Sequence, residues 1–95
     1  MENLEFKTLI IDQNQKICKI NGEEISLTKK EYELLVFFLK NPNKVHSREE
    51  LISLWNESAS ERSVDVMISR LRKKLGEYGK YIITRSGFGY IFKEI

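Results

Sequence analysis

The side chains of this sequence that could do chemistry are concentrated between Glu61 and Leu75, where cations accompany an apolar pattern at helical spacing. The apolar positions predict an amphipathic helix with one buried face; they are Val64, Met67, Ile68, Leu71 and Leu75. The opposite face would carry Arg62, Val66, Ser69, Arg70 and Lys73, with Arg72 and Lys74 beside it. Five cations against one anion, Asp65, suit a helix that enters a groove between phosphate chains.

Val66 is the apolar exception on the predicted outer face. An apolar side chain in that place is unfavourable in water unless a partner covers it, and a thymine methyl group in a DNA major groove would do so. Taken alone, however, the segment is equally compatible with a basic surface helix that only faces solvent. Both interpretations stay open at this level.

Composition limits the fold to one small domain over residues 1–95, because 41% of the 95 residues are apolar and 32% are charged. Charge is unevenly placed: residues 1–61 hold 8 cations and 11 anions, whereas residues 62–95 hold 8 cations and 3 anions. A nucleic acid would therefore meet the second part of the chain. Cys18 is the only cysteine, so no disulfide forms within the chain and we expect a reduced, cytoplasmic setting.

Catalytic and metal-binding patterns are missing from the sequence. It has no glycine-rich phosphate loop, no paired catalytic carboxylates, no Ser/His/Asp set and no Cys/His pair at zinc spacing. His46 is the only histidine, and we interpret it as a surface or packing residue. We therefore predict that the protein is not an enzyme and uses no cofactor or metal.

The elements that would position the basic helix follow from local signals. Segments 6–11, 16–20 and 24–26 predict an antiparallel sheet within residues 5–27, with an Asn21-Gly22 hairpin turn and Cys18 packed inside. Two capping boxes, Thr28 to Glu31 and Ser47 to Glu50, open helices over about 28–40 and 47–55. The basic helix covers about 60–75 and ends at Gly76. Strands 81–84 and 90–92, joined by a turn with two glycines, form a C-terminal β-hairpin over about 81–93.

Five segments of the chain resemble a known family. They are L-T-K-K-E-Y-E-L-L (27–35), S-R-E-E-L (47–51), Trp55, R-S-V-D-V-M-I-S-R-L-R-K-K-L (62–75) and G-F-G-Y-I-F (87–92). In combination, over residues 5–93, they resemble the C-terminal DNA-binding effector domain of OmpR/PhoB-type response regulators. The resemblance implies an α+β winged helix-turn-helix, with a four-stranded N-terminal sheet, a three-helix core and a C-terminal β-hairpin wing.

The family places its third helix in the major groove and its wing tip in the adjacent minor groove. By position, Arg70 is expected to read a base, in the geometry that arginine adopts with guanine, and Val66 to meet a thymine methyl. Other positions of the basic helix fall where the family touches phosphates or bases: Arg62, Ser63, Met67, Ser69 and Arg72. Three further residues fall at positions where the family contacts the DNA backbone: Trp55, Thr84 and Tyr90. Packing is the alternative for Trp55, Thr84 and Tyr90, and Lys73 is assigned from the helical wheel alone.

Two features depart from the family pattern: one residue of the wing and the length of one loop. Many relatives have arginine immediately before the first wing glycine, whereas here Ser86 occupies that position and the cation is Arg85. Strand alternation would send these two side chains to opposite faces, so either the turn redirects Arg85 or minor-groove insertion is weak. The segment 56–63 before Val64 is shorter than in some relatives, which leaves the mode of activation open. The family contacts RNA polymerase through this loop, here Asn56, Glu57, Ser58, Ala59 and Ser60.

The resemblance also implies partners. We expect double-stranded DNA with tandem promoter repeats, RNA polymerase, a receiver domain with a phosphorylated aspartate, and a sensor kinase. On this interpretation the chain is an excised effector domain, monomeric by itself and weak in binding because linkage to a second copy is lost. Two alternatives remain: a winged-helix module that contacts an acidic protein, and the effector domain of a membrane-anchored one-component regulator.

Overall fold

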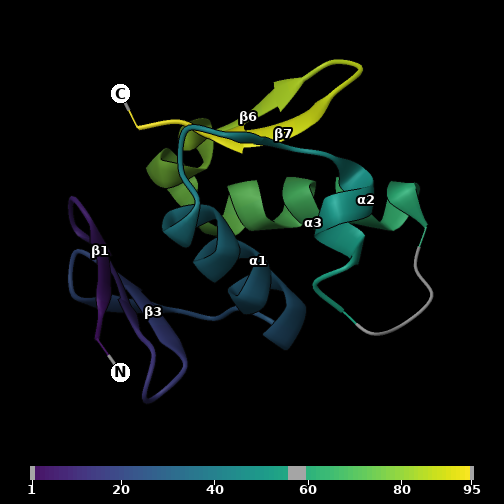
Figure 1. The fold of residues 1–95 in the computed structure, drawn as a ribbon. Helices are drawn as coiled ribbons and strands as arrows, with labels where there is room; N and C mark the ends of the chain where they lie inside the picture. Colours follow the sequence, from purple (N-terminus) through teal and green to yellow (C-terminus); the bar gives the residue numbers. More distant parts are fainter. Residues whose placement is uncertain (1, 56–59, 95) are drawn as a thin grey trace.

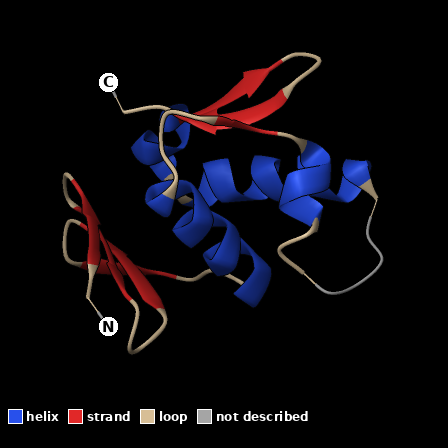
Figure 2. Ribbon diagram, in the orientation of Figure 1, coloured by secondary structure: helices blue, strands red, loops and turns tan. Residues whose placement is uncertain are grey.

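Two antiparallel sheets lie on either side of a group of helices in the computed structural model, which describes residues 2–55 and 60–94 (Figures 1 and 2). The N-terminal sheet has the order β1-β2-β3-β4. Its strands are β1 (Leu4–Phe6), β2 (Leu9–Asp12), β3 (Ile17–Ile20) and β4 (Glu23–Ile25). Asn21 and Gly22 have φ values of 51° and 82°, which confirms the predicted hairpin turn.

The first predicted strand, 6–11, is wrong in one respect, because the chain reverses within it. Lys7 adopts a φ of 55°, and β1 then pairs with β2 through Phe6 and Leu9. Lys7 and Thr8 are not among the glycine or asparagine residues that signal a tight hairpin turn, so the sequence predicts a single strand there. The split produces the four strands that the family resemblance implies.

Helix α1 (Lys29–Lys40) begins with the predicted capping box, since Thr28 Oγ1 accepts from Glu31 N–H and Glu31 Oε1 accepts from Thr28 N–H. Helix α2 (Arg48–Ile52) is shorter than the predicted 47–55, because the amides of Leu54 and Trp55 bond to carbonyls three residues back, as in turns, instead of four. Helix α3 (Glu61–Lys74) matches its prediction, with Ser60 as N-cap and Gly76 following at a φ of 57°.

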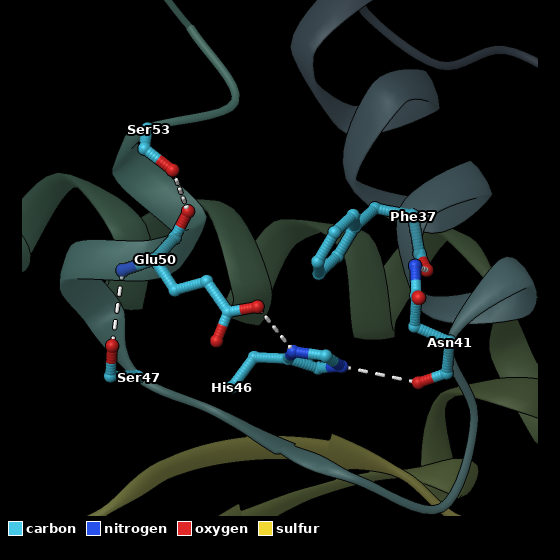
Figure 3. Close-up of polar contacts among 6 residues, drawn as sticks. All are labelled: Phe37, Asn41, His46, Ser47, Glu50 and Ser53. Atoms are coloured by element: carbon cyan, nitrogen blue, oxygen red, sulfur yellow. Dashed lines mark hydrogen bonds and ion pairs between the residues drawn. The ribbon is translucent and has the colours of Figure 1, made fainter.

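The second capping box is only half formed. Ser47 Oγ accepts from Glu50 N–H, but the Glu50 carboxylate turns to His46, with Oε2 2.8 Å from Nδ1 (Figure 3). The other ring nitrogen of His46 lies 3.1 Å from the Asn41 carbonyl oxygen, and the ring of Phe37 packs edge-on at 4.7 Å. His46 is 1% exposed, so the packing interpretation of this residue holds.

A short 3-10 helix, η1 (Gly76–Tyr81), leads from α3 into the C-terminal sheet, whose order is β5-β7-β6. Strand β6 (Ile82–Arg85) and β7 (Gly89–Phe92) form the predicted hairpin, and β5 (Val45–His46) adds a strand that the sequence did not suggest. A Cβ on Gly89 would lie 2.0 Å from the His46 carbonyl oxygen, so only glycine allows β5 and β7 this close.

One hydrophobic core packs α3 against the other helices and against both sheets. Side chains from the N-terminal sheet, α1, α2, α3 and the C-terminal sheet meet in one cluster, which includes Leu9, Leu35, Leu51, Leu71 and Phe92, each with 0% exposure. Cys18 is buried beside Ile11 on the paired strand, as predicted, and burial raises the pKa of its thiol to about 11. Helix α3 is thus fixed on its apolar side.

An ion pair fastens the start of α1 to the last turn of α3. Glu31 Oε1, on a side chain that is 3% exposed, lies 2.6 Å from Lys74 Nζ and also accepts from Thr28 N–H. Burial opposes ionisation of Glu31, but the hydrogen bonds from Lys74 and Thr28 outweigh it and lower the pKa of this carboxyl. Lys74 therefore has a structural partner within the domain.

Because the pKa of Glu31 is lowered by folding, its contribution to stability is present above the unfolded pKa and lost as pH falls through the folded pKa. We expect Glu31→Gln to lower the free energy of unfolding by about 1–2 kcal/mol at pH 7. The gap between variant and wild type should narrow as pH falls below about 4. Urea unfolding at several pH values measures this, with Glu49→Gln, an exposed first-turn acid of α2, as the control. A gap that stays constant with pH would contradict the role.

Candidate nucleic-acid interface

Helix α3 presents two chemically distinct faces, as the sequence predicted. Val64, Ile68 and Leu71 are fully buried, and Leu75 just beyond the helix is 2% exposed. The residues of the opposite side are exposed: Arg62, Ser63, Val66, Ser69, Arg70 and Lys73. Val66 is 42% exposed, which is unusual for an apolar side chain in this domain and keeps it available for a partner.

Ser60 caps the start of α3, where its hydroxyl oxygen satisfies one of the first backbone amides. Ser60 Oγ accepts from Ser63 N–H at 3.2 Å, and the two hydroxyl oxygens lie 3.1 Å apart. Of the residues described, none forms an ion pair with Arg62, Arg70 or Lys73. The described residues therefore leave these three cations on the outer face of α3 without a neutralising partner, which is the electrostatic condition for binding a polyanion.

Arg72 differs from the other cations of α3 because it is engaged with the wing. Its Nε donates to the Ile82 carbonyl oxygen at 2.9 Å, and its Nη2 donates to Thr84 Oγ1 at 2.9 Å. The guanidinium carbon also lies 5.6 Å from the centroid of the Tyr90 ring. Arg72 and Thr84 thus hold the hairpin against α3. Their hydrogen bonds fix both side chains at the junction of α3 and β6, and any phosphate that they bind must lie there.

A second link joins α2, α3 and the wing through Asp65. Tyr90 donates its hydroxyl to Asp65 Oδ1 at 2.5 Å, and Arg48 Nε donates to the same oxygen at 2.8 Å. The hydrogen bond from Tyr90 is the main reason that the pKa of Asp65 is lowered, and Arg48 adds to the effect. Tyr90 is 5% exposed, which agrees with the packing alternative weighed for it.

Arg48 is a component of this site that the sequence analysis missed. It follows the Ser47 N-cap, where a first-turn arginine gives no local signal of a partner 17 residues away. Its side chain is 44% exposed and also lies 3.9 Å from Glu61. Arg48 therefore compensates the charge of Asp65, with Glu61 also nearby, so this carboxylate opposes a phosphate less.

We expect Tyr90→Phe to loosen the wing while keeping the aromatic packing against Arg72. Loss of the hydrogen bond to a charged acceptor should lower the free energy of unfolding by about 1–2 kcal/mol. Hydrogen exchange at the β6 and β7 amides should accelerate more than exchange in the N-terminal sheet. Tyr32→Phe in α1 is the matched control, because no described residue hydrogen-bonds its hydroxyl. An acceleration that is equal in both sheets, or absent from β6 and β7, would show that the hydroxyl does not brace the wing.

The wing tip is a three-residue turn between Arg85 and Gly89. Phe88 N–H donates to the Arg85 carbonyl oxygen at 2.9 Å, and Gly87 has the positive φ of 82° that the turn needs. Arg85 and Ser86 are exposed, and the register places Arg85 on the face of Ile83, opposite Thr84. Phe88, which the sequence analysis did not single out, is 76% exposed at the tip.

Trp55 and Met67 lie at the margin of the site. Trp55 is 8% exposed and packs in the core, and its Nε1 is buried without a hydrogen-bond partner among the described residues. Met67 is half-buried against the core, at the edge of the buried stripe where the helical wheel placed it. Of the segment expected to contact polymerase, Asn56, Glu57, Ser58 and Ala59 lie outside the described residues, and Ser60 is the N-cap of α3.

The three helices and the hairpin that follows them define a winged helix-turn-helix with an N-terminal sheet, and the fold class predicted from the sequence is confirmed. Residues 22–92 match the family model described as transcriptional regulatory protein, C terminal. The chain belongs to this family, the OmpR/PhoB-type C-terminal DNA-binding domains, which are the output domains of response regulators. The family resemblance is likewise confirmed.

Curated relatives and solved structures agree with this assignment. The chain is 42% identical to the transcriptional regulatory proteins QseB of Haemophilus influenzae and ResD of Bacillus subtilis, over 90% and 95% of its length. It spans only 39% and 40% of those two proteins. The DNA-binding domain of the response regulator AdeR, solved with an intercistronic region, is 35% identical with a TM-score of 0.88, covering 98% of this chain and 100% of that one. The Klebsiella pneumoniae RstA domain, solved with the RstA box, is 28% identical with a TM-score of 0.86, covering 98% of both chains.

Proposed function

We propose that this domain binds double-stranded DNA sequence-specifically by inserting α3 into the major groove, as the output domain of a two-component response regulator. The observation that carries the proposal is the exposed face of α3, whose cations lack ion-pair partners in the described part of the chain while its other face is locked in the core. The complexes of AdeR and RstA with DNA support the same use of the fold.

The exposed residues of α3 divide by chemistry. Arg70 reads a base, because a guanidinium can donate two parallel hydrogen bonds to guanine O6 and N7, and Val66 contacts a thymine methyl. The remaining α3 residues position the helix on phosphates; they are Arg62, Ser63, Ser69 and Lys73. Met67 contributes its exposed edge only.

The wing and its supports add backbone contacts. Arg72 and Thr84, which are hydrogen-bonded to each other, contact the same phosphate. Tyr90 supports this contact indirectly, because its hydroxyl donates to Asp65 and so holds the wing against α3. Arg85 and Ser86 at the tip approach the neighbouring minor groove, where the exposed Phe88 accompanies them. Trp55 supports the phosphate contacts from the core.

The regulatory setting is part of the proposal. The chain acts as one domain, residues 1–95, within a longer cytoplasmic protein whose receiver domain is phosphorylated by a sensor kinase. Two such domains bind tandem repeats in promoters, and the segment from Asn56 to Ser60 contacts RNA polymerase. The isolated domain is a monomer, and its role is binding and not catalysis. No helix in the described ranges 2–55 and 60–94 is both long and apolar enough to cross a bilayer.

Fluorescence anisotropy with duplex DNA at several salt concentrations tests the proposal. The affinity should fall steeply with salt, with a log–log slope of about −4 if roughly four or five phosphates are contacted. Duplexes selected from a random pool should bind at least tenfold more tightly than the unselected pool. Binding that is absent at 50 mM salt, or equal for both duplexes, would overturn the proposal.

A further inference from the structure

A groove of about 640 Å³ runs between the start of α1 and the outer face of α3. Lys29 and Lys30 lie on its α1 side. Arg62 and Arg70 lie on its α3 side, together with the apolar side chains of Val66 and Met67. The groove therefore continues the surface assigned to DNA onto a helix that the proposed function has not used.

The charge of this groove is strongly positive. Four cations line it, and Glu31 is the anion beside them. The Glu31 carboxylate is already held by Lys74 at 2.6 Å and by the Thr28 amide, so it offers the groove little negative charge. Lys30 additionally lies 5.7 Å from the Trp55 ring centroid, and Lys29 has no ion-pair partner among the described residues.

The groove and the wing lie on different sides of α3. Arg72 binds β6 on one side of α3, whereas the groove opens on the side that faces α1. Figure 1 shows the β6–β7 hairpin and α1 on different sides of α3. A helix in the major groove has a phosphate chain along each of its two sides, so the wing can meet only one of them.

We propose that Lys29 and Lys30 bind phosphates of the DNA strand that borders α3 on the side away from the wing, with a deoxyribose packed on Met67. This inference rests on the proposed function and extends it to α1. A sugar–phosphate chain is apolar and anionic in alternation, which matches a groove with an apolar floor and cationic rims. An acidic peptide could satisfy the cations too, but Arg70 and Val66 belong to the same groove, so a duplex on α3 passes over it.

The test compares Lys29→Gln/Lys30→Gln with wild type on a random-sequence 20-base-pair duplex. Loss of two phosphate contacts should make the log–log salt slope shallower by about 1.8 units, and by the same amount on a selected duplex. Lys19→Gln/Lys40→Gln removes equal charge from β3 and from the far end of α1, and should leave the slope within about 0.3 units of wild type, because exposed charges beyond a Debye length are screened. Thermal unfolding of both variants checks that the Lys30 contact to Trp55 does not affect folding.

A direct readout accompanies the slopes: the duplex should protect Lys29 from acetylation in the wild-type domain, relative to Lys19. If the wild type binds DNA steeply but the groove variant behaves like the control and Lys29 stays reactive, the inference is wrong while the proposed function stands. If the wild type shows no salt-dependent binding, the proposed function itself fails. Capture of an acidic peptide with unchanged DNA binding would reassign the groove to a protein partner.

Discussion

Replacing Arg70 by alanine should weaken binding to a selected DNA site by about 1–3 kcal/mol and erase the preference at one base pair. The reason is that Arg70 is exposed on α3 beside Val66 and has no ion-pair partner among the described residues that would divert its guanidinium. Competition binding with duplexes that vary each position in turn measures both effects. The variant should fold normally, because no buried contact is removed.

Lys73→Ala is the matched control, since Lys73 is exposed on the same helix one turn from Arg70. Because Lys73 contacts a phosphate, its loss should weaken binding to selected and random duplexes alike and make the salt slope shallower by about one unit. Equal losses on selected and random DNA for Arg70→Ala would deny it the role of reading a base.

Leu71→Ala should produce the largest loss of stability, about 2–5 kcal/mol, because it removes a fully buried side chain from the underside of α3. A loss of this size is a substantial part of the total stability of a small domain. Urea or thermal unfolding measures it, and DNA binding should fall only in proportion to the folded fraction.

Val66→Ala on the opposite face is the control for that result. Its side chain is 42% exposed, so unfolding should change by less than about 0.5 kcal/mol, while preference for thymine at one position should weaken. If Val66→Ala destabilised the domain as much as Leu71→Ala, the assignment of buried and outer faces would be wrong.

The parts of the fold that the sequence predicts are those with a local cause. The Thr28 capping box, the Asn21-Gly22 turn and the end of α3 at Gly76 each depend on side chains a few residues apart, and each forms as expected. The apolar period of α3 predicts which face is buried and which is exposed, because an amphipathic helix is stable only when its apolar stripe packs against the core. Local signals of this kind are sufficient to locate the basic helix and to orient it on the core.

The features that could not be predicted from the sequence depend on contacts between residues far apart in the chain. Strand β5 forms only because Gly89 lets the chain approach His46, and Glu50 leaves its expected cap for the same histidine (Figure 3). Arg72 and Asp65 belong to a basic helix by sequence, yet three-dimensional packing directs one to Thr84 and the other to Tyr90. Helical periodicity says which face a side chain is on, but not which side chains of other elements meet it.

The most direct test of the account is an NMR titration of the domain with a selected duplex at low salt, followed by amide shifts along the chain. We expect the largest shifts at the exposed positions of α3 from Arg62 to Lys73 and at the wing tip, with the N-terminal sheet unchanged. Spectra in which α3 is unperturbed at 50 mM salt, or in which only residues 56–60 respond, would contradict it.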